Sequence, residues 1–395
     1  MVQEKKERYS NFEFLRILCM LSIVLGHFTE QSGIAHHNTI FSAFFYTASD
    51  SMMRVACSVF VIISAYFLTE KEFKIRRIVH TWLALIFYTV TITLTLKFKR
   101  PDLVSKFDIY RAFLPVETTP LWFLNYYIVL LCCSPVLNAY IKNSNKRSLQ
   151  WVLLGYIIFS SIYTTLSGRL DYFANDIWTF FFLYLATGFI KKYSINYSKW
   201  ISFIIFSIFW LLLTLLRTYA SLNPVSYYIT RYLELYRAQL MTIPNIVMAF
   251  SIFYFFKNIK IKTSKVINTV ARTTIGIYAF HQIPVFYPGL WKTIFHSSYY
   301  SVHRLGKFEY LYVLGVTVSV FCIGCILEII RSKISNILIE SKTWFKNICD
   351  SVDSDINCYN NNSEKTMAIG KVIICFVIYF LIFTIFLNTS MIQLP

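Results

Sequence analysis

Long apolar runs recur along this sequence, and they constrain the fold more than any other feature. A run of roughly 17–25 apolar residues can cross the hydrocarbon core of a bilayer as a helix. In hydrocarbon every backbone N–H and C=O group needs an internal partner, which helices provide. Of the 395 residues, 56% are hydrophobic and 15% are charged, against about 25% charged in a soluble domain. The pattern predicts an all-α, polytopic integral membrane helical bundle.

We predict about ten core transmembrane helices plus one extra C-terminal helix. No polar stretch is long enough to form a second globular domain. We expect a membrane domain over 1–335, a flexible polar cytoplasmic linker over 336–369, and an additional transmembrane helix within 370–395. The crossings are expected near 12–30, 51–69, 77–97, 121–141, 150–166, 177–190, 200–219, 241–256, 268–287, 308–330 and 370–388.

The net charge of +18 does not indicate a nucleic-acid-binding protein. Basic residues fall in short segments between the apolar runs, such as 71–77, 142–147 and 257–265, and not in one stripe or tail. Lys and Arg are about twice as frequent in the alternate loops that share a side with the N-terminus, which is the positive-inside bias. We therefore expect a cytoplasmic N-terminus, the lipid bilayer as a partner and no nucleic acid. Abundant Ile, Phe, Asn and Lys, without a eukaryotic targeting signal, favour a bacterial inner membrane.

The nine cysteines do not indicate a disulfide framework, because seven of them lie in apolar runs. Cys322 and Cys325 spell Cys-x-x-Cys inside a predicted helix, and we interpret them as small buried hydrophobic residues. His36 and His37 are adjacent in the first loop, without nearby acidic or cysteine ligands. We therefore expect no metal site.

The first apolar run carries two ionisable residues, Arg16 and His27, eleven positions apart. At about 100° per residue this spacing makes three turns plus roughly 20°, so both side chains share one helical face, about 16 Å apart in rise. Ionisable groups at membrane depth normally face a protein interior or a wet cavity and mark a functional site. The alternative is that Arg16 reaches the headgroups and His27 bonds a backbone carbonyl. Glu13 and Glu30, each three residues away, are candidate partners of Arg16 and His27.

Arg16-x10-His27 resembles the signature of the acyltransferase-3 family of membrane carbohydrate O-acyltransferases. Four later segments fit the family pattern in order: a phenylalanine-rich second helix, a basic motif at its cytoplasmic end, a Trp-Phe-Leu entry to the fourth helix, and a late Ser-x-Gly-x-Tyr-x-x-His segment. The resemblance covers residues 12 to about 330. The matching segments are Ser58–Leu68, Arg76–Arg77, Pro120–Leu124 and Thr274–His281.

Three positions depart from the family pattern. Ala65 stands where a glycine follows Ser64, and Ser58 stands where many members carry an acidic residue. His80 takes the place of the second arginine of an Arg-x-x-Arg spacing that begins at Arg77. These departures affect details of donor contact and not the reaction class.

The resemblance implies transfer of an acyl group, expected to be acetyl from acetyl-CoA, from the cytoplasmic side to a carbohydrate hydroxyl. The acceptor would be a capsule, exopolysaccharide or other envelope glycan. His27 would act as general base on the hydroxyl or carry the acyl group transiently. Arg16 would be catalytic and, with Arg76 and Arg77, would bind the CoA phosphates as guanidinium forks. The remaining substrate-binding candidates are Ser64, Trp122, Tyr278 and His281.

Other interpretations of these residues remain open. Arg76 and Arg77 also suit ordinary positive-inside anchoring, and Trp122 suits an interfacial aromatic belt. His281 could form a hydrogen bond across helices instead of lining the acceptor path. A transporter or flippase of lipid-linked sugars would need the same helices, and so would a non-catalytic partner of a polysaccharide-synthesis complex. Transport predicts charges spread over several spans, whereas here they concentrate in the first helix, which favours an enzyme.

Overall fold

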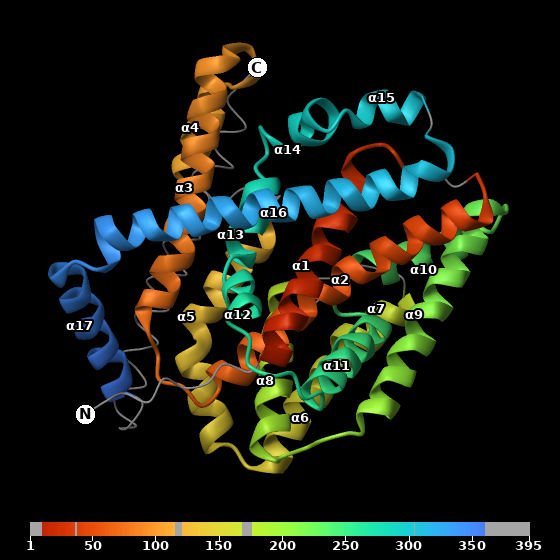
Figure 1. Ribbon diagram of the computed structural model, residues 1–395. Helices are drawn as coiled ribbons and strands as arrows, with labels where there is room; N and C mark the ends of the chain where they lie inside the picture. Colours follow the sequence, from red (N-terminus) through yellow and green to blue (C-terminus); the bar gives the residue numbers. More distant parts are fainter. Residues whose placement is uncertain (1–9, 36–37, 115–120, 168–175, 304, 360–395) are drawn as a thin grey trace, which may run out of the picture.

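The protein is an all-α membrane bundle, as predicted (Figure 1). The computed structural model describes residues 10–35, 38–114, 121–167, 176–303 and 305–359. Within these ranges there is no strand, and seven helices are long and apolar enough to cross a membrane. The predicted crossing at 370–388 and the pair His36-His37 lie outside the described residues.

The α-helices, in chain order, are α1 (Ser10–Gln31), α2 (Ile40–Leu68), α3 (Ile75–Lys99), α4 (Lys106–Phe113), α5 (Trp122–Asn143), α6 (Lys146–Tyr156), α7 (Tyr163–Ser167), α8 (Asp176–Lys192), α9 (Lys199–Leu222), α10 (Tyr227–Ala238), α11 (Ile243–Lys257), α12 (Lys265–Ala271), α13 (Thr274–His281), α14 (Tyr287–Gly289), α15 (Ser297–Val302), α16 (Glu309–Ser335) and α17 (Thr343–Tyr359). Two 3-10 turns, η1 (Pro101–Leu103) and η6 (Gly306–Phe308), and three π-helical segments, η4 (Ile157–Ile162), η5 (Leu290–Ile294) and η7 (Asn336–Glu340), complete the described elements.

Helix α1 lies at the centre of the bundle, where it contacts α2, α11, α12, α13 and α16 (Figure 1). Its inward face carries Leu15, Cys19 and Ile23, each almost fully buried. Such packing fixes α1 against neighbours on several sides, so the Arg16 and His27 side chains project into the protein and not into lipid.

Helix α9 is the opposite case and exposes a broad apolar surface, including Ile208, Leu212 and Leu215. An exposed surface of this kind suits contact with lipid tails. Cys322 is also exposed, on α16, and Cys325 is only partly buried, so the prediction that both residues of the Cys-x-x-Cys pair are buried is wrong for Cys322 and holds only in part for Cys325. The side chain lies on the outward face of its helix.

Helix α2 begins eleven residues before the predicted crossing at 51–69. Thr39 caps it by accepting a hydrogen bond from the Ser42 amide. Along this first part, Thr47 and Ser51 donate to backbone carbonyls four residues earlier. These bonds satisfy the hydroxyl groups within the helix, so a stretch with several polar residues is accommodated in α2.

The predicted crossing at 268–287 is discontinuous. It forms α12 and α13, interrupted at Arg272 and Thr273. At the break, the Thr273 and Thr274 hydroxyl groups donate to the carbonyls of Val270 and Ala271, and the Thr273 amide also donates to the Val270 carbonyl. Broken helices at membrane depth need such local partners.

Helix α17 occupies much of the segment expected to be a flexible linker. Asp353 accepts a hydrogen bond of 2.7 Å from the Ile75 amide and lies 3.3 Å from the Lys74 ammonium. A carboxylate at these first amides stabilises the positive end of the α3 dipole. Asn357 adds two hydrogen bonds to the Phe73 backbone. The linker therefore begins with a helix that docks on the start of α3.

Candidate active site

Three adjoining cavities lie between the helices. We call them the basic cavity, of about 1540 Å³, the linking cavity, of about 490 Å³, and the histidine cavity, of about 270 Å³. Tyr278 lines both the linking and the histidine cavities. The basic and linking cavities share Glu13, Arg16, Ser64, His80, Tyr127 and Ile275.

The basic cavity has an excess of positive charge. Nine Lys or Arg side chains line it against five Asp or Glu, an excess of four. Guanidinium and ammonium groups gathered in this way suit a ligand that carries several phosphates. The nine cationic residues are Arg16, Lys71, Lys74, Arg76, Arg77, Lys191, Lys257, Lys260 and Lys346.

Arg16 lies where the basic cavity meets the linking cavity. Its Nη1 donates to both carboxylate oxygens of Glu13, at 3.0 and 3.1 Å, so the predicted pair of these two residues is confirmed. The guanidinium carbon lies 6.0 Å from the Phe67 ring centroid. The arginine is thus held in place by a carboxylate and an aromatic face, and its side chain remains partly exposed to the cavity.

Arg76 and Arg77 both line the basic cavity, with different partners. Arg76 donates to Glu340 at 3.1 and 3.3 Å, whereas Arg77 donates to the Glu72 carbonyl at 3.1 Å. His80, at the position of the missing second arginine, has Nδ1 2.9 Å from the other oxygen of Glu340. Glu340 lies about 260 residues away in sequence, so no local sequence pattern predicts this contact.

His27 and His281 are in direct contact in the histidine cavity wall. Nδ1 of His27 lies 3.0 Å from Nε2 of His281, and Nδ1 of His281 lies 2.6 Å from the Ile277 carbonyl oxygen. A carbonyl oxygen only accepts, so Nδ1 of His281 carries a proton, and in the neutral ring Nε2 is an acceptor. Nδ1 of His27 therefore donates to it. Nε2 of His27 then carries the lone pair.

This contact identifies the hydrogen-bond partner of His27. His281, and not Glu30, bonds Nδ1 of His27. His281 itself is fully buried and is not among the described residues that line the three cavities. Of the two roles expected for His281, substrate binding and a hydrogen bond across helices, the second is the contact observed. Its position behind His27 suits a positioning residue that fixes the tautomer and orientation of the His27 ring.

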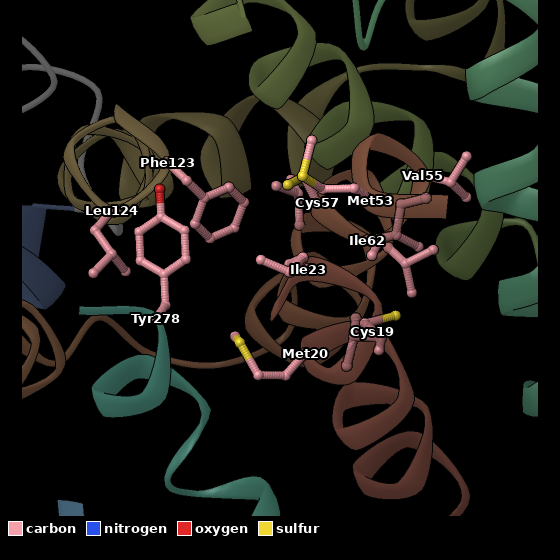
Figure 2. Packing of buried hydrophobic residues seen from close by; sticks show 14 of the residues in the cluster. Cys19, Met20, Ile23, Met53, Val55, Cys57, Ile62, Phe123, Leu124 and Tyr278 are labelled. Carbon is pink, nitrogen blue, oxygen red and sulfur yellow. The ribbon is translucent and has the colours of Figure 1, made fainter. Parts of the chain in front are cut away.

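Tyr278 separates the linking cavity from the histidine cavity. Figure 2 shows its ring beside Phe123 and Leu124 of α5, with Met20 and Ile23 of α1 nearby. The ring centroids of Tyr278 and Phe123 are 5.9 Å apart, and that of Tyr278 lies 6.1 Å from His27. The tyrosine therefore lies between the linking cavity and the His27 imidazole.

Ser64 and Trp122, the other substrate-binding candidates, lie in different cavities. Ser64 lines the basic and linking cavities and accepts a hydrogen bond of 3.2 Å from Tyr127. Trp122 lines the histidine cavity, where Arg54 lies over its ring at 5.3 Å. Arg54 was not among the predicted site residues, although an arginine inside an apolar run is itself a signal of a site.

The described residues contain no group of three or more His, Cys, Asp and Glu side chains arranged to hold a metal ion. In the comparison with known proteins, the model of the acyltransferase-3 family, described as an acyltransferase domain, matches residues 9–337. No curated protein and no solved structure matches the chain.

Proposed function

The chain belongs to the acyltransferase-3 family, and from that premise we propose that this membrane acyltransferase is an O-acetyltransferase. It moves an acetyl group from cytoplasmic acetyl-CoA to a hydroxyl of a cell-surface or lipid-linked carbohydrate, such as a capsule, exopolysaccharide or other envelope glycan. It lies in the bacterial inner membrane with its N-terminus in the cytoplasm, the orientation that the Lys and Arg bias favours.

The basic cavity is the entrance for the donor. Coenzyme A carries several phosphates, and Arg16, Arg76 and Arg77 present guanidinium groups to that cavity. Arg76 already has an anionic partner in Glu340, so a phosphate would have to displace or share that carboxylate. The acyl end of the donor extends through the linking cavity past Tyr278 toward His27.

The acceptor binds in the histidine cavity, beside Trp122 and Tyr278. One route is direct transfer, in which Nε2 of His27 takes the proton of the acceptor hydroxyl as its oxygen attacks the thioester carbonyl. The other is a two-step route through an acyl-histidine. Both need a neutral imidazole with its lone pair on Nε2, which the bond from Nδ1 to His281 favours.

The His27–His281 pair is the observation that carries the proposal. A nucleophile or base that is itself oriented by a third group recurs in enzymes that transfer acyl groups. Here Ile277 orients His281, and His281 orients His27. A fixed tautomer with a free Nε2 lone pair is the arrangement that a base or nucleophile needs.

The test uses purified protein in nanodiscs with radiolabelled acetyl-CoA and an envelope glycan extract. Wild-type protein transfers label to glycan, and His27→Ala abolishes transfer while expression and thermal stability are kept. His303→Ala is the matched control, because His303 is exposed and outside the described cavity walls. Retained transfer in His27→Ala removes this residue from the mechanism. Sugar exchange across vesicles without acetylation supports a flippase instead.

A further inference from the structure

Arg54 is a cation that lines the histidine cavity and has no role in the reaction proposed so far. It lies near the middle of α2 and lines this cavity together with His27. The two helices are in close contact at this level, because a Cβ on Gly26 would lie 2.7 Å from the Cβ of Met53. The guanidinium is therefore near the depth of the imidazole.

Arg54 lacks an anionic contact within the described part of the chain. Its Nε is buried and has no hydrogen-bond partner there, and no ion pair joins it to a carboxylate. Asp176, at the start of α8, acts on it through space only, and Oδ1 of Asp176 also lacks a described partner. Arg217 on α9 shows the ordinary arrangement: its guanidinium lies 2.6 Å from Asp50.

The Trp122 ring contacts the Arg54 guanidinium but gives its N–H groups no strong hydrogen-bond acceptor. The guanidinium carbon lies 5.3 Å from the ring centroid, which is within the range of a cation–π contact. An aromatic face attracts the charge but accepts no strong hydrogen bond. Arg54 is half-buried, and leaving its buried Nε without a hydrogen-bond partner is costly for a charged group. Such a group is well suited to an anion that forms only during the reaction.

We propose that Arg54 is a catalytic residue that stabilises the oxyanion formed on the acyl carbonyl. The inference rests on the proposed function, since an oxyanion forms only if a thioester is attacked here. Preorganised donors aimed at developing charge in a site sheltered from water are often the largest single contribution to catalysis.

The proposed reaction conserves atoms, protons and electrons and uses only residues already described. The acceptor hydroxyl gives its proton to Nε2 of His27 as its oxygen bonds to the thioester carbon. The carbonyl π electrons move onto the oxygen, which accepts hydrogen bonds from Arg54. Collapse re-forms the C=O bond and breaks the C–S bond, and the CoA thiolate takes the proton from His27. On the acyl-histidine route the same oxyanion forms when Nε2 attacks.

The main alternative is that Arg54 binds an acidic group of the acceptor sugar. Hydrolysis of acetyl-CoA separates the two roles, because water as acceptor has no acidic group but passes through the same oxyanion. The experiment therefore measures CoA release from acetyl-CoA by purified protein, with water alone and with envelope glycan extract added. CoA binding is measured separately by calorimetry.

Arg54→Gln is expected to lower kcat about 100- to 1000-fold in both reactions, as removal of an oxyanion donor does. CoA affinity and the KM for acetyl-CoA should change little, because the lost contact exists only in the transition state. Arg54→Lys keeps a positive charge without the guanidinium fork, and its kcat should lie between those of the wild type and Arg54→Gln. Arg147→Gln, which removes an exposed arginine outside the described cavity walls, keeps the wild-type kcat.

Two readouts keep the test decisive if Arg54→Gln folds poorly. Arg54→Lys retains the cation, and Arg54→Ala should regain activity when guanidinium is added at millimolar concentration. Wild-type hydrolysis in Arg54→Gln with reduced glycan transfer overturns the inference in favour of acceptor binding. An increased KM with unchanged kcat overturns it in favour of donor binding. Wild-type protein that releases no CoA in either reaction overturns the proposed function and the inference together.

Discussion

Replacing Gly276 with alanine should force α13 and α16 apart. The added Cβ would lie 2.2 Å from Oε2 and 2.6 Å from Cβ of Glu328 on α16. Glu328 has little freedom to move away. Arg331 donates to it at 2.6 and 2.9 Å, and Tyr88 donates at 3.0 Å. Rotation of the Glu328 side chain leaves its Cβ in place, so only a shift of the two helices relieves the overlap.

The expected loss of stability follows from three contributions. Overpacking in a closed core costs about 1–3 kcal/mol. Both Glu328 and Arg331 are almost fully buried, and losing their pair altogether would add about 3–5 kcal/mol. The helix propensity of alanine offsets about 1 kcal/mol. Because the helices can separate with the ion pair strained but not broken, we expect Gly276→Ala to lower the free energy of unfolding by about 2–4 kcal/mol.

Denaturant titration in detergent micelles, followed by tryptophan fluorescence, measures this free energy. Gly155→Ala and Gly315→Ala are matched controls, since no atom lies within 4 Å of the added Cβ at either position. Both should be neutral or up to about 1 kcal/mol more stable. A Gly276→Ala protein as stable as Gly315→Ala would show that the α13–α16 contact adapts freely, and the reasoning would be refuted.

Two further changes test the site and the docked helix. His281→Ala removes the acceptor of the His27 Nδ1–H bond and should lower kcat about 10- to 100-fold without changing the KM for acetyl-CoA. His281→Gln should retain more activity, because its amide oxygen can accept this hydrogen bond. An equal loss of activity in both variants argues against a positioning role. Burial raises the pKa of the Cys349 thiol on α17, so at pH 8 little thiolate is present and alkylation is slow. Asp353→Asn weakens α17 docking by about 1.5 kcal/mol and should speed Cys349 alkylation about tenfold, measured by peptide mass spectrometry. The charges of Asp353 and Asp350 both raise the pKa of this thiol, so Asp350→Asn, at an exposed position of α17, is the control for loss of charge alone. Equal rates in both variants would contradict docking through Asp353.

The membrane helices could be predicted from the sequence because run length and hydropathy are local properties. Each predicted crossing within the described residues coincides with a helix or with consecutive helical segments. The predicted helix boundaries are wrong where polar side chains form hydrogen bonds with the backbone of their own helix. Thr47 and Ser51 satisfy their hydroxyl groups inside α2, and Thr273 and Thr274 donate theirs to carbonyls at the break between α12 and α13. Hydropathy does not distinguish a polar side chain that ends a helix from one that bonds within it.

The Arg16–Glu13 pair was predictable because both residues lie on one helix. Residues three apart are neighbours whatever the rest of the chain does, and the ion pair is present. Arg16 and His27 likewise share a face by helical period alone, and each lines a cavity wall. Sequence spacing therefore determined which side chains of α1 face inward together.

Which distant group each of these side chains meets was decided only by the tertiary structure. His281 lies 254 residues from His27, and Glu340 lies 264 residues from Arg76. The Cβ clash that requires a glycine at Gly276 exists only because α16 crosses there. Periodicity and hydropathy describe one segment at a time, whereas a hydrogen bond of about 3 Å depends on how separate helices pack. The sequence determined the helices and the inward face of α1. The packing of α1 against α2, α13 and α16 determined the site.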